Sequence, residues 1–380
     1  MSDTSTSQLA RKTQLVDRLL RAMVERNGSD LHLIAGNPPR FRLHGDLQVL
    51  EPDLLDTEEL AQNLQTIATP LAAATFDREE QADFAYMIEG LSRFRVNVFR
   101  HLGGMGAVMR AIPSEAVTLD SLKLPDVVRG LCQHRQGMIL VTGKTGSGKS
   151  TTLAAMINEI NVRRKGHIIT IEDPIEFLHQ RRGCLISQRE VGNHTNSFAE
   201  ALHSALREDP DVVLVGELRD LETMSTAITA AEMGILVMGT LHTNGAAATV
   251  DRMVHAFPPE KQAHVRTMLS TSLRGVISQQ LCRRKTGDGR IPALEILVNT
   301  PAISNLLRQG KLDQLETAMQ SGASVGMRTM DSALQELLDR RFITAREAYE
   351  KASAKDRFRK LMEQSEPPGS HPGARPSNMA

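Results

Sequence analysis

The stretch Gly143–Ser150, GKTGSGKS, spaces its glycines, a lysine and a serine in the pattern G-x-x-x-x-G-K-S. An apolar run, Met138–Thr142, precedes it, and the segment TTLAAMINEI that follows suits a helix. Glycines let a backbone curl so that its amides face a phosphate, and the start of a helix adds partial positive charge. The pattern therefore predicts a loop that binds the phosphates of a nucleoside triphosphate.

Each polar residue of this loop has a predicted role. We expect Lys149 to reach the β- and γ-phosphates of ATP, and the Ser150 hydroxyl to ligate Mg²⁺. A glycine-rich turn with a chance lysine is the alternative, but the strand, loop and helix in this order argue against it. The predicted nucleotide-binding residues are Gly143, Lys144, Thr145, Gly146, Ser147, Gly148, Lys149, Ser150 and Thr151.

Three further apolar runs end in residues that could act on a triphosphate. DPDVVLVGELRD ends its run at Glu217, HIITIEDPIEF at Glu172 and Asp173, and VMGTLHTNGAA at His242. Carboxylates beside a phosphate site can hold a metal or activate water, and a histidine can sense the γ-phosphate by hydrogen bonding. Taken singly, a surface acid or a structural histidine remains the alternative for each.

Arginines alternate with apolar residues before this region. In RFRVNVFRH, residues 93–101, Phe94, Val96 and Val98 would point to one face of a strand, and Arg93 and Arg95 to the other. AVMRAIP is its predicted hairpin partner. The basic residues Arg93, Arg95, Arg100 and Arg110 form either a solvated surface or, for one or two of them, arginine fingers of the nucleotide site.

The elements that must position these residues predict an α/β protein. Continuous β-branched runs from residue 124 onward suggest a parallel sheet that is buried on both faces, where chemistry collects at the carboxyl ends of strands. Residues 260–281 are predicted as one amphipathic helix. The expected division is a disordered N-terminus (1–8), a small α+β domain (9–112), a linker (113–124), a core with C-terminal helices (125–365) and a disordered tail (366–380).

Composition excludes some classes of function. The formal net charge of zero, the absence of Trp and the presence of only two Tyr argue against nucleic acid as a partner. No stretch approaches 18 consecutive apolar residues, so we expect no membrane span and a cytoplasmic protein. The dispersed cysteines, Cys132, Cys184 and Cys282, are expected to be buried and reduced.

Four segments occur in the order seen in one family. GKTGSGKSTTLAAM, ITIEDPIEF, REDPDVVLVGELRDLETM and GTLHTNGAAATVDRMVHAFP resemble the Walker A, Asp, Walker B and His boxes of type II/type IV secretion ATPases. GSDLHLIAGNPPRFRLHG and RFRVNVFRHLGGMGAVMRAIP resemble the type IV pilus retraction ATPases of the PilT/PilU family. The resemblance implies a RecA-like P-loop NTPase core and an N-terminal PAS-like domain. It also implies a homo-hexameric ring that binds ATP and Mg²⁺ between the two domains.

The resemblance also implies roles for individual residues. Arg95 and Arg110 match the phosphate-contacting arginines of the N-terminal domain. Glu172 matches the candidate general base, Glu217 the Walker B acid that would hold Mg²⁺ with Ser150, and His242 the His-box position. The roles of the two glutamates are not separated by sequence.

The implied function is a hexameric ATPase motor for pilus retraction and twitching motility, placed at the cytoplasmic inner-membrane base of the pilus machine on a platform protein. Segments such as GCLISQREVG favour a PilU-like member slightly, whereas REDPDVVLVGE is more PilT-like. In AISNLLRQ, Ser304 and Gln309 stand where PilT-type members carry Arg and Glu. The alternatives are an accessory ATPase that depends on, and associates with, a PilT paralogue, and a RecA-like nucleic-acid motor.

Overall fold

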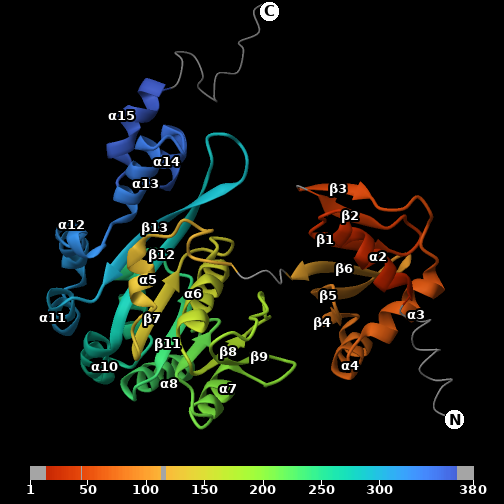
Figure 1. Cartoon of the computed structure of the whole chain (residues 1–380), viewed down its shortest axis with the longest axis horizontal. Coiled ribbons are helices and arrows are strands. Elements are labelled where there is room, and N and C mark those ends of the chain that lie inside the picture. Colours follow the sequence, from red (N-terminus) through yellow and green to blue (C-terminus); the bar gives the residue numbers. More distant parts are fainter. Residues whose placement is uncertain (1–13, 44, 113–116, 366–380) are drawn as a thin grey trace, which may run out of the picture. The chain divides into compact units, whose positions relative to one another are not determined.

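The computed structural model describes residues 14–43, 45–112 and 117–365, which fall into two compact units (Figure 1). The first unit runs to residue 115 and takes in two later segments, Pro174–His179 and Glu190–His194. The second unit holds the rest of the chain from residue 116. The termini predicted as disordered, and residues 113–116 of the predicted linker, lie outside the described residues.

The first unit is an antiparallel sheet with three described helices, and its strand order is β3-β2-β1-β6-β5-β4. The predicted hairpin is confirmed, because β5 and β6 pair in continuous register from Arg93 opposite Ile112 to His101 opposite Gly104. The elements are α2 (Gln14–Glu25), β1 (Asp30–Ile34), β2 (Arg40–Leu43), β3 (Asp46–Val49), α3 (Thr57–Ile67), α4 (Pro70–Glu79), β4 (Gln81–Ile88), β5 (Ser92–His101) and β6 (Gly104–Ile112).

The alternation predicted for β5 is present, with one exception. Phe94, Val96 and Val98 are buried in the core of this unit, and Arg95 is exposed on the opposite face. Arg93 is only 8% exposed, although it lies on the same face as Arg95. Its guanidinium donates to Glu190 Oε2 at 2.7 Å, and this buried ion pair explains why the charge is sheltered from solvent.

The second unit is built on a seven-stranded sheet of order β13-β12-β7-β11-β10-β8-β9. Strands β8, β10, β11, β7 and β12 run parallel, and β13 is antiparallel to β12. The strands are β7 (Gly137–Thr142), β8 (His167–Glu172), β9 (Leu185–Glu190), β10 (Val212–Val215), β11 (Leu236–Leu241), β12 (Leu273–Arg283) and β13 (Arg290–Val298).

Helices cover both faces of this sheet, as the continuous apolar runs predict. Ile139 and Val141 of β7 share a core with α5 and α6, and the alternate residues Met138 and Leu140 are buried as well. The described helices are α5 (Asp126–Leu131), α6 (Lys149–Arg163), α7 (Phe198–Ala205), α8 (Leu221–Glu232), α9 (Ala246–His255), α10 (Pro259–Ser272), α11 (Pro301–Gln309), α12 (Leu315–Ser321), α13 (Met330–Asp339), α14 (Ala345–Lys351) and α15 (Lys355–Ser365). The predicted α/β fold class is confirmed.

The prediction of one helix over residues 260–281 is wrong in its second part. The helix α10 ends at Ser272, and Leu273 begins β12. The apolar pair Val276 and Ile277 is compatible with either a helix or a strand, and both side chains are fully buried. Pairing with β7 on one side and β13 on the other decides for the strand, because both ladders of backbone hydrogen bonds are then satisfied.

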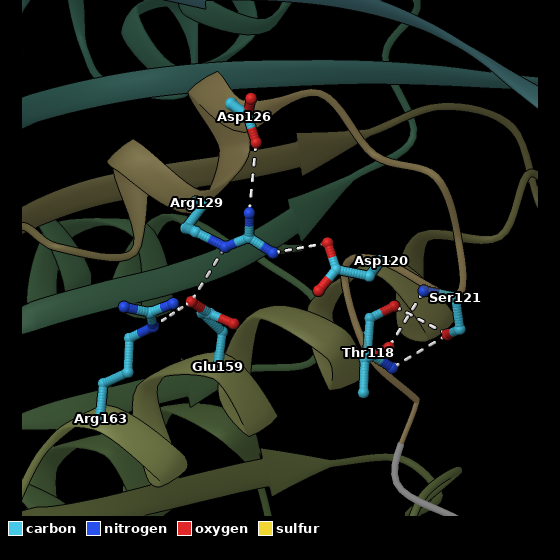
Figure 2. A network of polar contacts seen from close by, with 7 residues as sticks. All are labelled: Thr118, Asp120, Ser121, Asp126, Arg129, Glu159 and Arg163. Atoms are coloured by element: carbon cyan, nitrogen blue, oxygen red, sulfur yellow. Dashed lines mark hydrogen bonds and ion pairs between the residues drawn. The ribbon is translucent and has the colours of Figure 1, made fainter.

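A polar network holds the start of the second unit on α6 (Figure 2). The Arg129 guanidinium donates to Asp120 Oδ1 at 2.7 Å, to Asp126 Oδ1 at 3.2 Å and to Glu159 Oε1 at 3.2 Å. Glu159 also pairs with Arg163. One cation thus joins residues 120–129 to the middle of the helix that the phosphate-binding loop opens.

Candidate active site

The ends of four strands meet at one edge of the sheet in the second unit. In the parallel register Thr142 lies opposite Leu241, so Gly143 and His242 follow side by side. Val215 lies opposite Ile171, so Glu217 and Glu172 follow at the same edge. The fold therefore brings together the predicted loop, both predicted glutamates and the predicted histidine, although Gly143 and His242 are 99 positions apart in the sequence.

The loop between β7 and α6 has the backbone that a phosphate cradle requires. Gly143, Gly146 and Gly148 have φ values of 138°, 76° and 88°, which residues other than glycine rarely adopt. A Cβ atom at Gly143 would lie 2.3 Å from the carbonyl oxygen of Gln279. The glycine is therefore required by space as well as by conformation.

The polar side chains of the loop are poised around its interior. Lys149 Nζ donates to the carbonyl oxygens of Gly143 at 2.9 Å and Lys144 at 3.3 Å. The Ser147 hydroxyl is buried and has no hydrogen-bond partner among the described residues. A buried donor without a partner, next to a curled backbone at a helix N-terminus, fits a phosphate group as its ligand. Ser150 and Thr151, in the first turn of α6, are half-buried.

Gln279 on β12 supports the loop, and sequence reasoning missed it. Its Nε2 donates to the Ser147 carbonyl oxygen at 2.7 Å, and its Oε1 accepts from Thr152 Oγ1 at 2.7 Å. Both groups of the amide are satisfied, and the side chain is 3% exposed. The helix predicted over residues 260–281 includes this residue, and a helix there does not predict a contact with the loop. A strand predicted over residues 273–283, next to the strand that precedes the loop, would have placed Gln279 beside it.

Glu217 lies close to the side chains of an arginine and a histidine. Its Oε2 lies 2.7 Å from Arg219 Nε, and its Oε1 lies 3.2 Å from His242 Nε2. These residues line a cavity of about 420 Å³ together with Thr243 and Arg252. The Walker B and His-box positions thus lie within ion-pair distance of each other.

Glu172 lies in a different environment at the same sheet edge. It is 9% exposed, and its Oε1 accepts hydrogen bonds from Thr170 Oγ1 at 2.7 Å and Gln188 Nε2 at 3.3 Å. Both of these donors are uncharged. These contacts, from Thr170 on the same strand and Gln188 on β9, are ones that sequence alone could not show.

The predicted arginines belong to the first unit, where the sheet register gathers them. Arg110 lies opposite Arg95 on one side and opposite Asp30 on the other. Arg110 Nε donates to Asp30 Oδ1 at 2.7 Å, and Arg95 Nε lies 3.7 Å from Asp83 Oδ1. Both arginine side chains are exposed. Their contact with a nucleotide stays a prediction.

Asp30 is almost buried beneath this pair of arginines. Burial raises the pKa of its carboxyl group, but hydrogen bonds from Ser29 and Arg110 and the charge of Arg110 outweigh it, so that the pKa lies below its ordinary value. The carboxylate is therefore ionised and holds the Arg110 guanidinium over the sheet.

None of the helices in the described ranges is both long enough and apolar enough to cross a bilayer. The three cysteines are buried and form no disulfide, as predicted.

The chain is similar to several known proteins. A family model described as type II/IV secretion system protein matches residues 5–324. The type IV pilus retraction ATPase PilT of Pseudomonas aeruginosa is 47% identical over 90% of this chain and 99% of its own length. The type IV pilus ATPase PilU of the same organism is 38% identical, with 91% of each chain covered. A crystal structure of the pilus retraction motor PilT with bound ADP superposes with a TM-score of 0.84 at 43% identity, covering 89% of this chain and 97% of that one.

Proposed function

Because the chain belongs to the family of type II/IV secretion system proteins, we propose that it is a hexameric ATPase motor that drives type IV pilus retraction. The observation that carries this proposal is the convergence of the phosphate-binding loop, two glutamates and a histidine at one sheet edge. The resemblance to a retraction motor that binds ADP supports ATP as the substrate. The protein would act at the inner-membrane base of the pilus, on a platform protein.

The proposed chemistry divides the two glutamates by their environments. Glu217 follows β10 at the position of the Walker B acid, 2.7 Å from Arg219, and we assign it to metal binding with Ser150. Mg²⁺ bound there would neutralise charge on the phosphates. Glu172 accepts hydrogen bonds from Thr170 and Gln188 at the end of β8, and we assign it the role of orienting and deprotonating the attacking water.

The remaining residues bind and orient the triphosphate. Lys149 would exchange its loop carbonyls for the β- and γ-phosphates, and His242, already fixed by Glu217, would sense the γ-phosphate. Arg95 and Arg110 would complete the site as phosphate contacts. Turnover would then depend on the conformation of the whole subunit. This dependence would couple hydrolysis to the displacement of a docked pilus protein.

Autonomous retraction and accessory action are both compatible with this site. The identity to PilT is higher than that to PilU, so the slight preference for a PilU-like member is not supported by overall similarity. Ser304 in α11, however, donates to the Ser270 carbonyl oxygen at 2.6 Å, a contact that the arginine of PilT-type members would not make in the same way. We propose the autonomous motor, with association with a paralogue as the alternative.

Steady-state hydrolysis of ATP tests the site. We expect Lys149→Ala to abolish turnover, because the phosphates lose their cation, while the protein stays folded with a cooperative melting curve. Lys261→Ala, an exposed lysine on α10, is the matched control and should be fully active. Hydrolysis by Lys149→Ala at the wild-type rate would refute the assignment.

Twitching motility tests the biological function. The chain is expressed as the sole retraction ATPase in a strain from which all others are deleted. Restored twitching that is lost with Lys149→Ala supports an autonomous motor. Restoration only together with a second retraction ATPase supports the accessory role, and no effect in either background refutes pilus retraction.

A further inference from the structure

A cavity of about 560 Å³ lies in the second unit, and none of the residues assigned to hydrolysis lines it. It is formed by the segment that precedes β7, the starts of β8 and β10, and the C-terminal end of α6. The phosphate-binding loop follows the other end of β7 (Figure 1). Six residues of strand at about 3.3 Å each separate the two places by roughly 20 Å, so the cavity is distinct from the ATP site.

Positive charge dominates the lining. Arg135, Arg163, Arg164 and Lys165 contribute four permanent cations, and among the described residues Asp211 is the only acidic one in the lining. Asp211 Oδ2 is already engaged by the backbone N–H of His167 at 2.8 Å. The cations therefore exceed the available carboxylate.

Two of these cations lack a partner within the described ranges. Arg163 pairs with Glu159 (Figure 2), and Arg164 donates to the carbonyl oxygens of Cys132 and His134. Arg135 and Lys165 make neither a hydrogen bond nor an ion pair with any described residue, and both are exposed. Burial, and to a smaller degree the charge of Arg135, lower the pKa of the Arg164 guanidinium, whereas Cys132, Cys184 and Asp211 raise it.

From this cavity and its charges we propose a second anion site, which binds a small molecule carrying two or more linked phosphates. Guanidinium groups match phosphate oxygens in pairs, and two arginines with a lysine can neutralise the charge of a diphosphate. The volume lies within the range of small-molecule sites and exceeds that of a single phosphate. Among the described residues, no Phe, Tyr or Trp lines the cavity, so the proposal rests on the phosphates and not on a nucleobase.

The test measures binding of inorganic pyrophosphate to the full chain by calorimetry. The ATP site is first saturated with ADP without added metal, so that pyrophosphate does not enter it. We expect one further site per chain whose affinity falls as salt is raised. Arg135→Ala/Lys165→Ala should weaken this binding at least about tenfold, because two charge-assisted contacts are lost.

Two variants make the outcome decisive. Arg308→Ala/Lys261→Ala also removes one exposed arginine and one exposed lysine from the second unit, outside the cavity, and should bind pyrophosphate as the wild type does. Lys149→Ala should retain the second site. Absence of binding to the wild type, equal binding by the Arg135→Ala/Lys165→Ala variant, or loss of binding in Lys149→Ala would each overturn the proposal.

Discussion

At the scale of single residues, Gln279 shows how the loop depends on a side chain from a distant strand. Its amide joins the Ser147 carbonyl to the Thr152 hydroxyl, on both sides of Lys149. The loop glycines allow the curled backbone, but they do not select it over other conformations. The amide supplies that selection by two buried hydrogen bonds.

We expect Gln279→Ala to lower the free energy of unfolding by about 1–3 kcal/mol, because two buried polar groups lose their partner. The loop should also become less ordered, and ADP should bind more weakly. Chemical denaturation and ADP titration check both effects. The neighbouring Gln280→Ala is the control, since Gln280 contacts only the Lys351 carbonyl at 3.4 Å and is half-buried. Unchanged ADP affinity in Gln279→Ala would contradict this role.

The two glutamates should separate in binding and rate experiments. Glu172→Gln keeps an acceptor for Thr170 but removes the base, so hydrolysis should fall about 100-fold or more while ATP binding persists. Glu217→Gln removes the charge that faces Arg219 and is expected to weaken magnesium-dependent ATP binding as well. Single-turnover hydrolysis and equilibrium binding distinguish the two effects. The reverse pattern would exchange the assigned roles.

The stabilisation of the first unit by Asp30 should be lost in acid. Its pKa is lower in the folded state than the ordinary value of 3.8, so ionised Asp30 favours folding above that pH. This stabilisation is lost as the pH falls through the folded-state pKa. Amide hydrogen exchange of β1 and β6, compared between wild type and Asp30→Asn, should therefore differ at pH 7 and converge as the pH drops below 3.8. A difference that grows in acid would show that the sign is wrong.

At the scale of elements, α11 is where this chain departs from PilT-type sequences. The helix is capped by Thr300 at its start and by Gly310, in a left-handed conformation, at its end. Ser304 hydrogen-bonds to the C-terminal part of α10 rather than presenting a long cation. The helix itself is thus retained, and its chemical surface has changed.

Restoring the two family residues tests what that surface does. We expect Ser304→Arg/Gln309→Glu to increase twitching when this chain is the sole retraction ATPase. Stability should fall by about 1 kcal/mol, because the bond to Ser270 is lost. Ser304→Ala, which loses the same bond without adding a charge, controls for stability. Equal twitching by the double variant and the wild type would remove α11 from the explanation.

At the scale of the whole molecule, turnover should depend on a residue of the first unit. Arg110→Ala is expected to reduce ATP turnover at least about tenfold, since an arginine finger stabilises charge in the transition state. Because the change also leaves Asp30 without its cation, Arg110→Lys is needed to separate charge from geometry. Arg78→Ala, whose exposed side chain pairs with Glu79, should have no effect. Full activity of Arg110→Ala would return that residue to an ordinary surface role.

Sequence alone determined the features that depend on neighbours along the chain. The spacing of Gly143, Gly148 and Lys149 predicts the loop, and the alternation in β5 predicts its two faces, because each pattern reports local backbone geometry. The order of the apolar runs was also enough to predict a parallel sheet and the edge at which its chemistry collects.

Only the tertiary structure decided the features that depend on contacts between distant segments. Residues 273–283 suit a helix or a strand, and pairing with β7 makes them a strand that carries Gln279 to the loop. The burial of Arg93 requires Glu190, which lies 97 residues away. The basic cavity exists because the segment before β7, the end of α6 and the starts of β8 and β10 line one space. Hydrogen-bond pairing and charge compensation across such separations leave no periodic signal in the sequence.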